Sequence, residues 1–213
     1  YTGSDTTTNL GIGYRKIIDS DKLVGLNGFW DYRMVDYGPS HSRWGIGAEF
    51  GWKDLSITNN WYIAGTGVHS VTIDGSQYQE RVVPGWDVEV AYRLPSNPNI
   101  SLALKAYRWD YQKTNDVDGA EGSVSWQATP HLALKTWAST NIAAYPTTEN
   151  ANLDDDNLRI GLGFTWSHRP VVFKKQDYRR NLSTQMTQPV RRTYDVLLER
   201  YSSGSGFINR ASG

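Results

Sequence analysis

The chain has 213 residues, with 22 basic and 22 acidic side chains, so its formal net charge is zero and we expect no nucleic-acid partner. It contains no Cys, which excludes a disulfide framework, a thiol nucleophile and a thiolate metal site. No apolar run is as long as a membrane-spanning helix, which excludes a helical membrane protein but leaves a membrane β-barrel open as an alternative.

Nine segments of the chain alternate with a period of two between apolar residues and small or polar residues. The clearest short example is WGIGAEFGW, residues 44–52. A period of two is typical of a β-strand with two unlike faces, and about ten residues suit a tilted strand that crosses a bilayer. The pattern slips near Tyr107, where we expect a bulge or the membrane rim. The predicted strands are residues 9–18, 24–34, 44–52, 55–63, 86–94, 100–105, 121–128, 131–138 and 158–166.

The connections between these strands alternate in length. Short connections are residues 18–22, 53–54, 95–99 and 129–131, and longer polar ones are residues 35–42, 65–81, 112–120 and 139–156. Short periplasmic turns and long external loops are typical of outer-membrane barrels. We therefore predict an all-β fold, a transmembrane antiparallel β-barrel with about nine strands visible. Because a simple bacterial barrel has an even number, we expect a further strand before Tyr1, from another chain, or hidden in the pattern.

The two faces of the predicted strands are expected to meet different surroundings. Trp has an apolar body and a polar tip, so Trp on the apolar face is expected to form girdles at the membrane interfaces. These girdle residues are Trp30, Trp44, Trp52, Trp86 and Trp166. Glycines and acidic residues on the other face leave room for water or polypeptide. The predicted lumen-lining residues are Asp31, Gly45, Gly47, Glu49, Asp87 and Glu89.

The last part of the chain breaks the alternating pattern. We divide the chain into barrel strands, residues 1–169, and a basic linker, residues 170–213. The linker is either a solvated periplasmic segment or a chain that threads the lumen, roughly over residues 175–205, in extended form. In the second interpretation its cations pair with the acidic wall through charge-assisted hydrogen bonds. The candidate luminal residues are Arg179, Arg180, Arg191, Arg192 and Tyr194.

Five stretches carry a family resemblance: NLGIGYRKI (9–17), LVGLNGFWDY (23–32), HSRWGIGAEFGWKD (41–54), YQERVVPGWDVEVAYRLPS (78–96) and TYDVLLER (193–200). The chain resembles the translocator barrel of the intimin and invasin family, the inverse autotransporters. The resemblance implies a twelve-strand barrel in the bacterial outer membrane. It also implies that the chain re-enters the lumen after the last strand and carries an adhesive passenger outward.

The resemblance also implies a set of partners. These are outer-membrane lipid, the barrel assembly machinery and periplasmic chaperones during biogenesis, and a host or surface receptor that the passenger contacts. The first strands of the family's barrel are absent, and no immunoglobulin-like passenger domains follow Gly213. We expect both departures to reflect truncation of a longer protein.

No residue pattern predicts catalysis, a cofactor or a metal site. The four His residues are scattered without ligand spacing, and no Ser has a base placed beside it. The acidic run at residues 154–156 either binds a divalent ion or is a solvated loop. Tyr78, Glu80 and Arg81 form a polar cluster that enters a strand, and we expect a loop-anchoring ion pair at the rim, which contributes little if it is exposed. The rival function is a porin-like diffusion channel.

Overall fold

The computed structural model describes residues 5–140 and 158–202. Within them, nine antiparallel strands form one sheet in the order β1-β2-β3-β4-β7-β8-β9-β10-β11. The strands are β1 (Thr6–Ile18), β2 (Lys22–Met34), β3 (His41–Trp52), β4 (Leu55–Ala64), β7 (Gly85–Arg93), β8 (Ile100–Trp109), β9 (Val117–Thr129), β10 (Leu132–Thr140) and β11 (Arg159–Trp166). The nine predicted segments are these nine strands, and the all-β barrel fold is confirmed.

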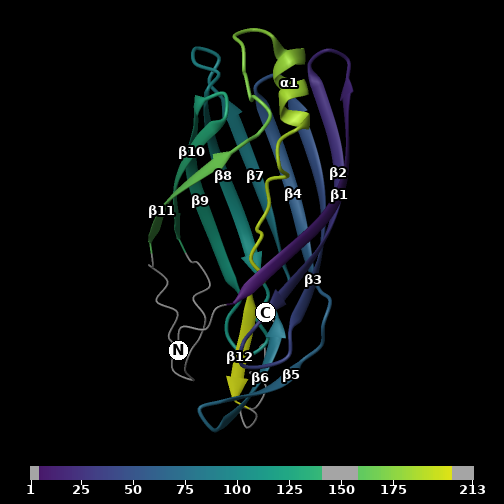
Figure 1. Cartoon of the computed structure of the whole chain (residues 1–213), viewed down its shortest axis with the longest axis vertical. Helices are drawn as coiled ribbons and strands as arrows, with labels where there is room; N and C mark the ends of the chain where they lie inside the picture. The colour runs from purple at the N-terminus through teal and green to yellow at the C-terminus, as the bar shows by residue number, and fades with distance from the viewer. Residues whose placement is uncertain (1–4, 141–157, 203–213) are drawn as a thin grey trace, which may run out of the picture.

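The sheet curves around a hollow and is open between β1 and β11, which do not pair with each other within the described residues (Figure 1). Consecutive strands pair over nearly their whole length, as in the register of β1 with β2 from Thr6↔Met34 to Ile18↔Lys22. The bulge expected near Tyr107 was wrong, because β8 continues through Trp109, whereas the alternative of a membrane rim there stays a prediction. The register shift between β9 and β10 lies instead at Leu132/Ala133, beside their short turn.

A second, three-stranded sheet has the order β12-β6-β5 and lies beyond one end of the large sheet (Figure 1). It contains β5 (His69–Ile73), β6 (Ser76–Val82) and β12 (Leu198–Ser202). The prediction that residues 65–81 form a loop was wrong, since β5 and β6 form a hairpin between β4 and β7. Asp74 and Gly75 form its two-residue turn, and both have a positive φ, which suits the twist of a tight hairpin.

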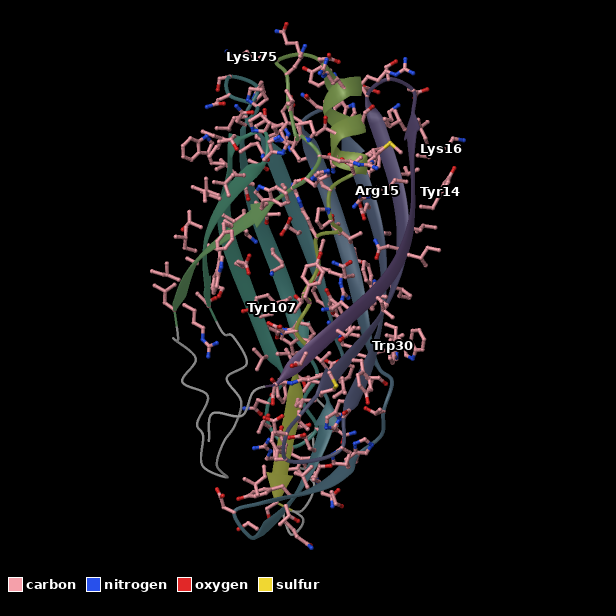
Figure 2. The ribbon with its side chains drawn as sticks, viewed as in Figure 1. Tyr14, Arg15, Lys16, Trp30, Tyr107 and Lys175 are labelled. Carbon is pink, nitrogen blue, oxygen red and sulfur yellow. The ribbon has the colours of Figure 1, made fainter. Side chains whose placement is uncertain are left out.

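The sheet is apolar outside and polar inside, the reverse of a soluble fold. Figure 2 shows Tyr14 and Lys16 on the outside of β1, whereas Arg15 between them points toward the described part of the linker, residues 170–202, called the tail below. Two small apolar clusters lie toward the end that carries the second sheet. One is centred on Tyr62 and Trp109, and the other joins Val82 of β6 to Leu198 of β12. Among the described residues, no helix is long and apolar enough to cross a membrane.

The predicted girdle tryptophans lie toward the two ends of the outer face. Trp30 faces Trp44 across β2 and β3, and Trp86 faces Trp61 across β7 and β4. Trp52 and Trp166 end their strands at the opposite end, beside short turns. Trp44, Trp52 and Trp166 are exposed, whereas Trp30 and Trp86 are half-buried. Their role at the membrane interfaces stays a prediction.

The tail contains a helix that the sequence prediction missed. The expectation of an extended chain over residues 175–205 was wrong for α1 (Tyr178–Met186). Asp177 caps this helix, because its carboxylate accepts a hydrogen bond from the Arg180 N–H at 3.2 Å. After Thr187 the chain crosses the hollow without helix or strand and pairs with β6 as β12. In Figure 1, α1 lies at the end with the β1–β2 turn, and β12 lies at the opposite end.

Candidate functional site

One contact between tail and sheet is centred on a buried carboxylate that two guanidinium groups share. Asp31 of β2 accepts hydrogen bonds from Nε and Nη2 of Arg43, at 3.0 and 2.8 Å. Arg192 of the tail approaches the same carboxylate, with Nη1 at 3.1 Å from Oδ2 and with Nη2 paired to Oδ1. The side chains of Asp31 and Arg43 are 0% exposed, and that of Arg192 is 1% exposed. Charge-assisted bonds in such a water-poor place are stronger than surface pairs.

Small and aromatic residues complete this site. A Cβ added to Gly45 would lie 3.2 Å from Nη1 of Arg192, so the glycine leaves the space that the guanidinium fills. The two cations also lie over aromatic rings, Arg192 over Phe29 at 4.0 Å and Arg43 over Tyr62 at 4.4 Å from the ring centroids. The carboxylate and the rings therefore share the compensation of two buried positive charges.

A second carboxylate, Asp87 of β7, lies further along the inner face. It accepts hydrogen bonds from Asn60 Nδ2 at 2.6 Å and from Tyr62 Oη at 2.6 Å. The tail closes the network, because Thr193 Oγ1 donates to Asp87 at 3.1 Å and the Thr193 N–H donates to Tyr62 Oη at 2.8 Å. Asp87 thus positions two wall side chains that both contact the tail.

The wall also binds the main chain of the tail. Four inner-face side chains donate to tail carbonyls, as follows. Arg15 donates to Gln188 O at 2.6 Å, Asn60 to Arg191 O at 2.9 Å, Arg43 to Thr193 O at 2.7 Å and Asp195 O at 2.8 Å, and Arg33 to Val196 O at 2.6 Å. An extended chain without a strand partner needs such donors, since buried carbonyls are costly when unpaired.

Near the end of the described part of the tail, two crossed salt bridges join β6 and β12. Arg81 pairs with Glu199, Nε to Oε2 at 2.7 Å, and Glu80 pairs with Arg200, Oε2 to Nη2 at 2.7 Å. Glu80 also accepts from His41 at 2.9 Å and from Tyr37 at 3.0 Å, and its side chain is 0% exposed. The rim ion pair expected at residues 78–81 is present, but the charged partners of Glu80 and Arg81 come from the tail, and Glu80 is buried.

The predicted linker residues divide into two groups. Arg179 and Arg180 lie exposed on α1 and, in the described part of the chain, make no ion pair with the wall. Arg191 lies 3.3 Å from Glu89, Nη1 to Oε1, and Arg192 contacts Asp31 as above. Tyr194 is exposed, and its hydroxyl donates to Val190 O at 2.6 Å. The side-chain pairing therefore lies after α1 and not within it.

The predicted wall residues all lie on the inner face. Asp31, Glu89 and Asp87 contact the tail directly, whereas Glu49 contacts it through Arg15, whose Nε lies 2.8 Å from Oε2 of Glu49. Gly47 lies between amide side chains, since a Cβ there would be 2.5 Å from Asn60 Oδ1. Their functional assignment stays a prediction.

Sequence reasoning missed the role of the inner-face arginines and the ion pairs between β6 and β12. Alternation alone puts Arg33 and Arg43 on the inner face, so strand parity was the available signal for them. No local signal shows that Glu199 pairs with Arg81, because 118 residues separate the two. The acidic run at residues 154–156 lies outside the described residues. Within the described ranges, no group of three or more acidic or His side chains is placed to hold a metal ion.

The site at β6 predicts a pH dependence. Burial alone raises the pKa of the Glu80 carboxyl, but hydrogen bonds from His41, Arg200 and Tyr37 together lower it below its ordinary value. A lowered pKa in the fold means that the carboxylate stabilises the fold above the unfolded pKa and loses this effect as the pH falls through the folded pKa. We expect Glu80→Gln to lower the Tm at pH 7, and the difference from wild type to shrink below about pH 4. Melting curves from pH 7 to pH 3 test this, and a constant difference contradicts it.

Comparison with known proteins identifies the family. The model described as "Inverse autotransporter, beta-domain" matches residues 2–194. The chain is 35% identical over 131 residues to the "Putative attaching and effacing protein homolog" of Escherichia coli (strain K12), which covers 61% of this chain and 41% of that protein. It is 28% identical over 212 residues to the "Inverse autotransporter adhesin YeeJ" of the same strain, covering 93% of this chain and 8% of that protein.

Two further likenesses agree. "Invasin" of Yersinia enterocolitica is 36% identical over 103 residues, 48% of this chain and 12% of that protein, so the chain spans less than half the length of each relative named here. A chain solved in a study of in-meso crystallization of membrane proteins has a similar fold, with a TM-score of 0.72 at 19% identity, covering 93% of this chain and 82% of that chain. The resemblance found in the sequence is confirmed, and the chain lies in the bacterial outer membrane. It belongs to the family of inverse autotransporter β-domains.

Proposed function

We propose that this chain is an outer-membrane anchor and translocator that exports and displays a C-terminal adhesin. Residues 1–169 contribute strands to a barrel of twelve, and residues 170–213 are the linker that threads its lumen. The observation that carries the proposal is the course of the tail. It leaves β11 at the end with the short turns, crosses the inner face and pairs with β6 at the far end (Figure 1).

The chemistry of the wall supports transport of a chain. Arg15, Asn60, Arg43 and Arg33 donate to main-chain carbonyls of the tail, and such contacts do not depend on side-chain identity. A wall of this kind can bind many extended sequences in turn. Assembly in the membrane involves the barrel assembly machinery and periplasmic chaperones, and the displayed adhesin contacts a host or surface receptor.

A diffusion channel is the second candidate function. A cavity of about 330 Å³ lies between the tail and the inner face of β8, β9 and β10, and its lining includes Ser101, Ala103, Ser123 and Lys135. If the protein is mainly a channel, removal of residues 171–213 leaves its conductance unchanged. If it is an anchor, the same removal opens the lumen and conductance rises.

Side-specific labelling in intact cells tests the threaded tail. The chain contains no Cys, so single variants report one position each. We expect an impermeant maleimide to label Ser205→Cys, which lies just past the described residues, and to spare Lys175→Cys until the outer membrane is permeabilised. Val68→Cys, on the exposed β4–β5 connection, is the control for the outer surface. Labelling of Val68→Cys without Ser205→Cys would leave the tail in the periplasm and contradict the proposal.

A further inference from the structure

We propose that two Glu-Arg dipeptides, Glu80-Arg81 on β6 and Glu199-Arg200 on β12, form a register lock that stops the exported tail at one position. The inference rests on the proposed function, because it assumes that the tail moves outward through the lumen. In this view the Leu-Glu-Arg segment at residues 198–200 stops the tail by pairing with β6.

The two dipeptides lie opposite each other on antiparallel strands. In the antiparallel register of β6 and β12, Glu80 is opposite Arg200 and Arg81 is opposite Glu199. Both carboxylates are fully buried, whereas Arg81 and Arg200 are 12% and 25% exposed. Each pair therefore depends on its partner strand, because removal of one member of a buried pair leaves the other uncompensated.

This charge pattern selects one register. A slip of one residue places Glu80 opposite Glu199, or Arg81 opposite Arg200, so that like charges meet. A slip of two residues keeps the faces but places Glu80 opposite Leu198, or Arg81 opposite Tyr201, so that the ion pairs are lost. The observed register is the one among these that satisfies all four charges, which is how cross-strand pairs specify alignment.

The two faces of β12 meet different surroundings, which strengthens the selection. On one face, Leu198 packs in the apolar cluster with Val82 and Val196, and Arg200 lies 4.7 Å from the ring centroid of Tyr37. On the other face, Glu199 accepts hydrogen bonds from two backbone N–H groups of the β8–β9 loop. These are the N–H groups of Gln112, at 3.0 Å, and of Lys113, at 2.7 Å. A one-residue slip would place a cation, Arg200, against these donors.

Most contacts inside the lumen do not determine which tail residue lies at which position of the inner face. Arg15, Asn60 and Arg33 donate to carbonyls, which every residue of an extended chain carries. Only side-chain pairs distinguish one position from the next. Arg192 with Asp31 is one such pair in mid-lumen, and the crossed pairs at β6 are the last ones before the end of the described tail.

Disulfide trapping in intact cells measures the register directly. The pair Gln79→Cys with Tyr201→Cys reports the observed register, since these residues are opposite each other. The pair Gln77→Cys with Tyr201→Cys reports a slip of two residues. We expect the first pair to crosslink at least about tenfold more than the second. Arg81→Glu is expected to reduce the first crosslink about tenfold, because a buried charge then faces a like charge.

Exchanging the charges of the Arg81–Glu199 pair distinguishes a register lock from a general loss of folding. Adding Glu199→Arg to Arg81→Glu is expected to restore roughly half of the first crosslink, since the swapped pair attracts again but loses the loop N–H bonds. Arg179→Glu makes the same charge change on exposed α1 and is expected to change nothing. The milder variant Glu199→Gln keeps an acceptor for the loop, and it is expected to raise the slipped crosslink severalfold even if Arg81→Glu fails to assemble.

The outcomes separate this inference from the proposed function. If Glu199→Gln and Arg81→Glu both leave the ratio of the two crosslinks unchanged while Ser205→Cys is labelled from outside, the register lock is overturned and the threaded anchor stands. If Ser205→Cys is not labelled in the unmodified background, the proposed function itself fails. Loss of the first crosslink in Arg81→Glu together with its recovery in the exchanged variant supports the lock.

Discussion

Replacing Leu104 with arginine is expected to destabilise the folded barrel strongly and to lower the fraction of the protein that folds in the membrane. Leu104 is in the middle of β8, opposite Val90 of β7, and 72% of its surface is exposed on the outer face. Because that face meets lipid, a charge near the bilayer midplane costs about 2–4 kcal/mol. A barrel with a net stability of roughly 5–15 kcal/mol loses a large part of it. The shift between folded and heated bands on a gel measures the folded fraction.

The control is the adjacent residue on the other face. Ala103 lines the cavity beside the tail, so the arginine of Ala103→Arg reaches a polar space that can hold water. We expect the folded fraction of Ala103→Arg to stay close to that of wild type. Equal folded fractions for the two variants would show that the inner and outer faces are assigned wrongly.

Asp31→Ala is expected to release the tail from the sheet. Arg43 and Arg192 both depend on this carboxylate, and without it two buried guanidinium groups lie close together with no anion in contact among the described residues. Breaking a buried ion pair by removing one partner costs about 3–5 kcal/mol. Since Arg43 also donates to Thr193 O and Asp195 O, the tail loses main-chain contacts when Arg43 moves.

Limited proteolysis of the folded protein measures this release. Arg191 and Arg192 are trypsin sites that the wall protects, so cleavage there is expected to rise at least about tenfold in Asp31→Ala. Arg179→Ala, on the exposed surface of α1, removes a charge without touching the wall and is expected to leave cleavage at residues 191–192 unchanged. Protection that persists in Asp31→Ala would mean that the main-chain contacts alone hold the tail.

Under the proposed function, the division between side-chain and main-chain contacts would let one inner face serve two tasks. Donors such as Asn60 and Arg33 bind any extended chain through its carbonyls, which suits passage of a long polypeptide. Acidic groups such as Asp31 and Glu80 bind chosen cations, which suits a fixed final position. Both tasks require a polar inner face, and the exposed outer face carries the apolar residues that a membrane needs.

The sequence by itself determined the strands and their faces. Alternation is a local property, because successive side chains in a strand point to opposite sides, so Trp44 and Glu49 can be assigned to opposite faces from residues 44–52 alone. Loop lengths then indicated an outer-membrane barrel, since short turns alternate with long loops in such barrels. The placement of Asp31 and Asp87 on the inner face followed from the same parity.

The tertiary structure alone decided what the inner face binds. Helix α1 forms at one mouth, where Leu182 packs near Gly51, and a basic polar segment carried no periodic signal for it. The β5–β6 hairpin gains a third strand, β12, which joins it only after the tail has crossed the sheet. The pairing of Arg81 with Glu199 closes a separation of 118 residues, and such a contact depends on the register of every strand between them. Charge and pattern were visible in the sequence, but which charges meet is a property of the assembled fold.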